Sequence, residues 1–137
     1  MPARFMLDTD VCIYFQTGAH PRIVERFLSL RSGEAVISVV TYGELHLGAA
    51  KSVQKARALA AITKVTSFAP VERLSAEAAE DYGSIRAELE RAGQTIGNND
   101  LWIAAHARST GFTLVTNNER EFRRVPGLAV ENWANAA

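Results

Sequence analysis

Short apolar runs alternate along the chain with longer stretches of helical periodicity. Phe5 to Leu7 is a short apolar run that ends at Asp8, and Ala35 to Val40 is a continuous β-rich run, typical of a strand buried on both faces. Further strands are predicted at Val65 to Pro70, Phe112 to Thr116 and Ala129 to Trp133. Strands separated by a dozen or more residues of helical pattern predict an α/β fold with a central parallel sheet and helices on both faces.

The segments between these strands have apolar residues at helical spacing. A first helix is predicted after Asp8, and a second is expected to include Ile23 and Phe27 and to close at Gly33. Later helices are predicted at about 41–50, 53–64, 75–92 and from 100 to just before Gly111, and 117–124 is expected to be a polar loop with room for one helical turn.

Length and charge fit one ordinary globular domain. The 137 residues, 47% of them apolar, suffice for one sizeable core, so residues 1–137 are expected to form a single domain. Fifteen Lys and Arg balance fifteen Asp and Glu, which excludes a whole-protein basic field for attracting nucleic acid. Any such contact has to come from a local basic patch, for which Arg120, Arg123 and Arg124 are candidates.

Other classes are excluded by what the sequence lacks. Cys12 is the only cysteine, which rules out a disulfide framework and a cysteine-based zinc site. The N-terminal apolar stretch is too short for a signal peptide, and the longest apolar run falls far short of the ~20 residues of a membrane span. The three histidines lack metal-ligand spacing, and no Gly-rich phosphate loop is present. We therefore expect a soluble, cytoplasmic protein with no membrane partner.

Acidic and amide side chains gather at one end of the predicted sheet. Asp8 follows the first strand, Glu44 lies near the start of the helix after the second, and Asp100 opens the helix that leads to the strand at 112–116. Directly after that strand come Asn117, Asn118, Glu119 and Glu121. Ligands of parallel sheets bind beyond the carboxyl ends of the strands, so these segments are expected to meet. Clustered carboxylates repel unless a cation neutralises them, and Mg²⁺ or Mn²⁺ suits an all-oxygen set with room for phosphate. The pattern therefore indicates metal-assisted phosphodiester hydrolysis.

Each of these acids also has a purely structural interpretation. Asp8 and Asp10 are suitable N-caps for the first helix. Thr41 to Glu44 matches the capping box, in which the glutamate reaches back to the threonine backbone. Asp100 is an acceptable helix start, and Glu121 could be an ordinary solvated charge. Four independent caps at one sheet edge would be a coincidence, and a cap can still bind a metal.

Three stretches of the chain resemble the PIN domain of the VapC toxins from bacterial type II toxin–antitoxin pairs. They are FMLDTDVCIYF, VISVVTYGELHLGA and IRAELERAGQTIGNNDLWIAAHARSTGFTLVTNNEREFRRVPGLAVENW, in the family's order and spacing over about residues 4–133. The resemblance implies a single PIN domain with a parallel sheet of about five strands. It also implies a metal-dependent endoribonuclease, usually a homodimer, that a VapB antitoxin holds inactive in a higher assembly.

The resemblance also implies roles for individual residues. Asp8, Glu44 and Asp100 occupy the three main acidic positions, and the fourth is shared between Asn118 and Glu121. Asp8 and Asp100 would hold the principal Mg²⁺ or Mn²⁺ ion, while the two glutamates assist. Further residues expected in this pocket are Thr116 and Asn117.

Three positions depart from the family pattern. Most relatives have asparagine where this chain has Asp10, many PIN domains have aspartate where it has Asn118, and Asn98 replaces a frequent proline. The first departure adds a carboxylate beside Asp8, and the second puts the fourth ligand in doubt.

The leading hypothesis is therefore a metal-dependent ribonuclease toxin. Structured RNA such as tRNA is the expected substrate class, with the anticodon stem-loop of initiator tRNA as a specific candidate. Two alternatives remain open: a haloacid-dehalogenase-like phosphatase that uses Asp8 and Asp10, and a PIN module that binds a partner without catalysis. Surplus apolar residues on the first helices are expected to form part of a groove for an antitoxin helix. These residues are Val11, Ile13, Tyr14, Phe15, Ile23, Phe27 and Leu28.

Overall fold

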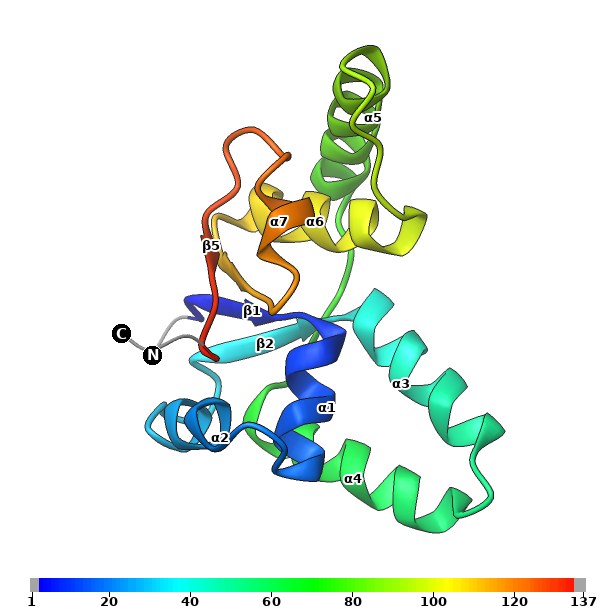
Figure 1. Cartoon of the computed structure of the whole chain (residues 1–137), viewed down its shortest axis with the longest axis vertical. Coiled ribbons are helices and arrows are strands. Elements are labelled where there is room, and N and C mark those ends of the chain that lie inside the picture. The colour runs from blue at the N-terminus through cyan, green and yellow to red at the C-terminus, as the bar shows by residue number, and fades with distance from the viewer. Residues whose placement is uncertain (1–2, 135–137) are drawn as a thin grey trace.

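Five short parallel strands form one sheet in the order β3-β2-β1-β4-β5 (Figure 1). The computed structural model describes residues 3–134, and the strands in this part are β1 (Phe5–Leu7), β2 (Ala35–Ser38), β3 (Val71–Glu72), β4 (Thr113–Val115) and β5 (Val130–Glu131). Every neighbouring pair is parallel. The predicted α/β fold with a five-stranded parallel sheet is confirmed.

Helices cover both faces of this sheet. Along residues 3–134 they are α1 (Thr9–Thr17), α2 (Pro21–Leu28), α3 (Val39–Lys51), α4 (Lys55–Phe68), α5 (Ala76–Arg91), α6 (Asn98–Thr110) and α7 (Glu119–Phe122). In Figure 1, α1 to α4 lie on one side of the sheet and α5 to α7 on the other. Strand residues alternate between the two cores: Phe5 and Leu7 pack with α1, α2 and α4, whereas Met6 and Leu114 pack with α5 and α6. None of the helices within residues 3–134 combines the length and the apolar character needed to cross a membrane.

The boundary between β2 and α3 differs from the sequence prediction. The strand ends at Ser38 and the helix begins at Val39, whereas the apolar run predicts a strand to Val40 and a helix from Thr41. The physical reason is a cap: Ser38 Oγ accepts a hydrogen bond from the Val40 N–H at 3.1 Å. The predicted capping box from Thr41 to Glu44 is therefore wrong, and Glu44 lies in the second turn of α3.

Two other predicted elements are also wrong. Residues 65–68 continue α4, and the backbone N–H of Ala69 still donates to the Val65 carbonyl at 2.9 Å. The third strand is the shorter Val71–Glu72. Gly33 does not close α2, which ends at Leu28; with φ of +85° it forms the turn into β2 instead.

The strand order places a topological switch point between β1 and β4. The chain runs from β1 outward through β2 to β3, and then returns to the other side of β1 to form β4. Beyond the carboxyl ends of these two strands lie Asp8 and Thr116, whose backbone N–H groups donate to Val115 and Glu131 respectively. Switch points of open parallel sheets are where ligands bind, so the fold presents Asp8 at the expected place.

Candidate active site

Asp8 is both a helix cap and a buried acid at the switch point. Its Oδ1 accepts from the Thr9 N–H at 2.8 Å, and its Oδ2 accepts from the Thr116 hydroxyl at 2.8 Å. The residue is only 6% exposed. Burial, followed by repulsion from Asp10, raises the pKa of Asp8 to about 7. The carboxyl group is thus rigidly held, and a nearby cation would strongly favour its ionised form.

Among the aspartates whose pKa is raised, Asp100 is repelled by the largest number of other carboxylates. It lies in the first turn of α6, which begins at Asn98, two residues earlier than the sequence predicts, so Asp100 is not the cap. Burial, followed by repulsion from Glu121, Glu44 and Asp10, raises its pKa to about 6. It also repels Asp8. Acids from three other segments, at Asp8 and Asp10, at Glu44 and at Glu121, therefore lie close to Asp100, so four segments of the chain meet here.

Glu44 is held in place by two polar side chains from other segments. The Thr9 hydroxyl donates to Glu44 Oε1 at 2.5 Å, and Asn99 Nδ2 donates to Glu44 Oε2 at 3.4 Å. Thr41, which the capping-box interpretation requires at the helix start, is buried inside α3 with its hydroxyl 3.3 Å from that of Thr9. Thr9 and Asn99 are not among the site residues predicted from the sequence; the signal that could have indicated them is that each adjoins one of the candidate aspartates.

Asp10 brings a third aspartate into the site. Its Oδ2 accepts from the backbone N–H of Asn117 at 3.2 Å. Its Oδ1 is buried and has no hydrogen-bond partner among the described residues. Burial raises the pKa of Asp10 as well. A buried carboxylate oxygen without a partner is costly unless it is protonated or near a cation.

Asn118 and Glu121, the two candidates for the fourth position, contact each other. Asn118 Nδ2 donates to Glu121 Oε2 at 3.0 Å, while the Asn118 N–H donates to the Thr116 hydroxyl oxygen at 2.9 Å. Glu121 is half-buried and repels Asp100. In this arrangement Asn118 orients Glu121, and Glu121 is the group that adds negative charge to the site. Asn117 lies at the rim, with its Nδ2 3.4 Å from the Tyr14 hydroxyl.

The donor set fits a hard divalent cation. Within residues 3–134 no three acidic, histidine or cysteine side chains stand ready to surround one ion. Mg²⁺, however, usually takes only one or two carboxylates and completes its octahedron with water and phosphate oxygens. Asp8 and Asp100 could supply those two carboxylates, and the unpartnered Asp10 Oδ1 and the raised pKa values mark a place where a cation would relieve repulsion.

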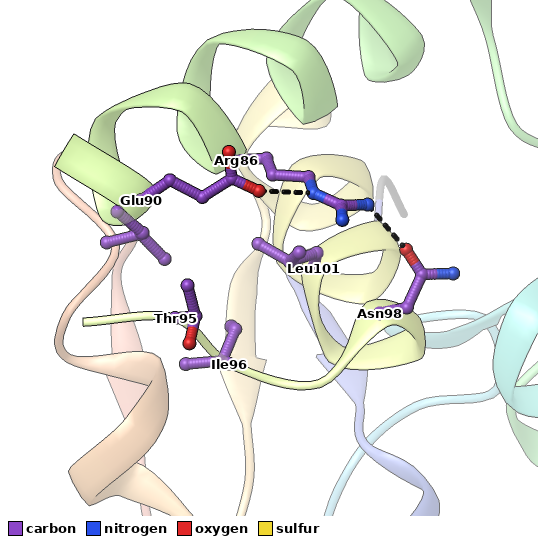
Figure 2. Close-up of a pocket in the computed structure, with 7 residues that line it drawn as sticks. Arg86, Glu90, Thr95, Ile96, Asn98 and Leu101 are labelled. Carbon is purple, nitrogen blue, oxygen red and sulfur yellow. Dashed lines mark hydrogen bonds and ion pairs between the residues drawn. The ribbon is translucent and has the colours of Figure 1, made fainter. Parts of the chain in front are cut away.

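Two arginines of the predicted basic group are engaged by neighbouring groups, and the described surface also has a groove and a smaller pocket. Of the predicted basic group, Arg123 pairs with Glu119 at 3.4 Å and Arg124 donates to the Thr95 carbonyl at 3.0 Å, while Arg120 is exposed. A broad groove of about 780 Å³ lies between α2, α7 and the end of β5, and its lining residues include Arg22, Arg26, Arg123, Glu119, Glu131 and Trp133. A smaller pocket between α5 and α6 is shown in Figure 2.

The apolar residues predicted to form part of a groove are divided between the core and the surface. Val11, Phe15, Ile23 and Phe27 are buried in the core. Ile13 and Leu28 remain exposed, and Tyr14 is half-buried. More exposed apolar surface lies on the hairpin of α3 and α4, at Leu47, Val53 and Leu59.

Comparison with known proteins gives one consistent family. A family model described as the PIN domain matches residues 5–128. The chain is 47% identical to the tRNA(fMet)-specific endonuclease VapC of Shigella flexneri, covering 96% of this chain and 98% of that protein. It is 42% identical to ribonuclease VapC2 of Haemophilus influenzae, with 95% and 98% coverage. Among solved structures it is similar to DNA-bound VapBC from Salmonella typhimurium, with a TM-score of 0.89, 43% identity and coverage of 96% and 98%. VapBC2 from Rickettsia felis bound to a promoter DNA fragment gives a TM-score of 0.86 at 35% identity, with coverage of 94% and 98%.

Proposed function

The chain belongs to the PIN domain family, and on that premise we propose that it is a VapC-type endoribonuclease, the toxin of a toxin–antitoxin pair. The observation that carries the proposal is the convergence of carboxylates on Asp100 from Asp8, Asp10, Glu44 and Glu121. A protein that only bound a partner would gain nothing from this repulsion. In metal-dependent phosphodiester cleavage the same carboxylates have a role, because they bind the cation that the reaction needs.

We propose Mg²⁺, or Mn²⁺, as the metal that this acidic site binds. Asp8 and Asp100 would hold the ion, with Asp10, Glu44 and Glu121 close enough to add negative charge. When bound, the ion supplies a more acidic water and stabilises charge on the phosphate. Thr116 keeps the Asp8 carboxylate oriented, and Thr9 and Asn99 do the same for Glu44. A carboxylate such as Glu44 or Glu121 could accept a proton from the attacking water.

The phosphatase alternative finds no support in this site. A haloacid-dehalogenase-like mechanism needs a lysine beside its paired aspartates. Lys51 ends α3, Lys55 begins α4, and the exposed Lys64 lies against the Phe15 ring on the α4 side of the sheet. Asp8, which would be the nucleophile of such a phosphatase, accepts hydrogen bonds at both carboxylate oxygens, from Thr9 and Thr116.

We propose tRNA as the substrate, with the anticodon stem-loop of initiator tRNA as the specific target. The support is the name of the 47% identical Shigella relative, a tRNA(fMet)-specific endonuclease, together with its nearly complete coverage. A chain of zero net charge has no general attraction for RNA, so recognition must rest on local contacts and on shape. A substrate of this kind places the protein in the cytoplasm.

The proposed partner is a VapB-type antitoxin, and the active form a homodimer that joins it in a larger assembly. The similar structures from Salmonella and Rickettsia are VapBC complexes. Exposed apolar side chains on α1, α3 and α4, including Ile13, Leu47 and Leu59, form a surface that the apolar face of an antitoxin helix could cover. An arginine of the partner could pair with the acidic cluster and exclude the metal.

The test is a cleavage map. Purified protein is incubated with total tRNA, with Mg²⁺ or with excess EDTA, and the new RNA ends are sequenced. The proposal expects one dominant cut in the anticodon region of initiator tRNA and none with EDTA. Cleavage of other RNA alone would overturn the substrate, and full activity in EDTA would overturn the metal.

A further inference from the structure

Two aromatic rings stack beside the N-terminal turn of α6. The Tyr82 ring from α5 and the Trp102 ring from α6 are nearly parallel, with centroids 3.9 Å apart and 13° between their planes. Tyr82 packs against the core of α5, α6 and the sheet, whereas Trp102 belongs to neither apolar core of the described residues. Trp102 is half-buried, so its indole offers part of its surface to solvent.

Arg86 extends this stack and fixes its orientation. Its Nη1 donates to Asn98 Oδ1 at 3.3 Å, and its Nε donates to Glu90 at 2.9 Å (Figure 2). The same Nη1 also donates to the Tyr82 hydroxyl at 2.7 Å. The Tyr82 hydroxyl donates in turn to Asn98 Oδ1. The guanidinium side chain is nevertheless 49% exposed. An indole, a phenol ring and a guanidinium are thus held as planar groups at the surface.

The stack is joined to the catalytic turn of α6. Asn98, which binds both Tyr82 and Arg86, is the first residue of the helix. The next residue, Asn99, donates to Glu44, and the one after that is Asp100. Asn98 and Trp102 are four residues apart and share one face of α6, whereas Asp100 lies on a different face. The link between the stack and the acids is therefore the N-terminal turn of α6, through Asn98 and through the contact of Asn99 with Glu44.

The pocket beside the stack does not itself fit a base. It has a volume of about 70 Å³ and is lined by residues that include Arg86, Leu89, Asn98 and Leu101 (Figure 2). That is space for a few water molecules at most. A base could therefore contact this region only at the surface, where part of the half-buried Trp102 indole is accessible.

Charge on α5 favours a neutral ring over a phosphate. The exposed side chains of this helix include Glu77, Glu80, Glu88 and Glu90, against two arginines, one of which is already paired. Phosphates would be repelled here, whereas the face of a base carries no charge. Single-stranded RNA loops are recognised by stacking unpaired bases on aromatic rings and guanidinium planes.

We propose that Trp102, supported by Tyr82 and Arg86, is a stacking subsite for one unpaired nucleobase of the RNA, close to the cleaved bond. The inference rests on the proposed ribonuclease function and adds a substrate-binding residue to it. Trp102 would then contribute to the preference of the protein for RNA loops over duplex RNA.

A matched pair of variants tests the subsite. W102F keeps a ring, whereas W102L keeps apolar bulk without one. Binding to an RNA hairpin with an unpaired loop is measured in EDTA, so that no cleavage occurs. W102L should weaken loop binding by about 5- to 100-fold, the range for loss of one base–aromatic stack, and W102F by about twofold or less. The salt dependence of binding should not change, because no phosphate contact is lost.

Removal of single bases from the loop identifies the stacked nucleotide. At one loop position, loss of the base should weaken binding to the wild type by a similar factor and leave W102L unaffected. In a W133F background, where Trp102 is the only tryptophan of the sequence, loop RNA should also quench the tryptophan fluorescence in EDTA, and a paired duplex should not. This second measurement does not depend on the fold of W102L.

Three results would overturn the subsite. One is unchanged loop binding by W102L, and another is the absence of any base position that couples to Trp102. The third is a lower molar mass of W102L in light scattering, because the indole would then be a contact between subunits. If the wild type bound and cleaved no RNA at all, the proposed function itself would fail, which is a different result.

Discussion

The Thr116 hydroxyl donates a 2.8 Å hydrogen bond to Oδ2 of Asp8 and so joins the ends of the two strands that flank the switch point. The same hydroxyl oxygen accepts from the Asn118 N–H. One side chain therefore orients the buried acid at the end of β1 and fixes the start of the loop that carries Glu121. This contact lowers the pKa of Asp8, against the larger effect of burial.

Replacement of Thr116 should shift the pH dependence of cleavage. Thr116→Val keeps the side-chain shape but removes the hydrogen bond, so the pKa of Asp8 should rise further. Activity needs the ionised carboxylate, and we expect the acid limb of the pH–rate profile to move to higher pH, with about a 10-fold loss near neutrality. Thr116→Ser is the control and should stay close to the wild type. Superimposable profiles for the valine variant and the wild type would contradict this role.

The metal-free protein should lose stability as the pH rises from about 4 to about 7. The pKa values of Asp8 and Asp100 rise from 3.8 to about 7 and about 6 in the folded state. Between these values the folded chain holds more protons than the unfolded chain, so the free energy of unfolding falls with increasing pH, by on the order of a few kcal/mol. Denaturant unfolding in EDTA measures the slope. Asp8→Asn and Asp100→Asn should each flatten it, and Mg²⁺ should restore stability more at pH 8 than at pH 5. A wild-type slope of the opposite sign would show that the pKa values of these acids are not raised in the folded state.

Most of the sheet is predictable from the sequence because its strands are buried on both faces. The runs at Phe5–Leu7 and Thr113–Val115 are short and mostly apolar, are flanked by polar residues and are separated by helical patterns. Few secondary structures other than a buried strand fit such runs. The convergence of Asp8, Glu44 and Asp100 follows from the same topology, since the carboxyl ends of parallel strands share an edge.

The errors arise where a side chain contact decides a boundary. Ser38 lies within an apolar run, and nothing in its neighbours shows that its hydroxyl caps α3. Val65 suits a strand by composition, but its backbone carbonyl completes the last turn of α4. The bonds from Thr9 and Asn99 to Glu44 span 35 and 55 residues, and no local spacing signals contacts over such separations.

Glu44→Gln separates catalysis from helix capping. Because Ser38 caps α3, the glutamate is not needed to start the helix, and glutamine can still accept from Thr9. We expect the melting temperature to stay within a few degrees and the cleavage rate to fall by about 100-fold or more, the range for loss of a group in acid–base catalysis. Ser38→Ala is the opposite control and should cost about 1–2 kcal/mol of stability. Unchanged cleavage by the glutamine variant would leave Glu44 with a structural role only.

Asp8→Asn should abolish toxicity without preventing antitoxin binding. Expression of the wild type without its partner is expected to arrest growth, and co-expression of the antitoxin to rescue it. The asparagine removes a charge from the proposed metal site but leaves the exposed apolar residues on α1, α3 and α4 intact. Growth curves and co-purification with the tagged antitoxin measure the two effects. A fully toxic variant would exclude Asp8 from catalysis, and complete loss of co-purification would show that the acidic pocket, not the apolar surface, dominates the interface.

The convergence of Asp8 and Asp100 on one catalytic metal is tested most directly by the rate of tRNA cleavage as Mg²⁺ is titrated into metal-free protein. The wild-type rate should rise from background to a plateau as the metal site fills. Asp8→Asn and Asp100→Asn should each lower the plateau by about 100-fold or more or require far higher Mg²⁺ to reach it, because each removes one carboxylate from a site that uses two. Wild-type cleavage that proceeds at full rate without Mg²⁺, or variants that match the wild type across the titration, would contradict the account.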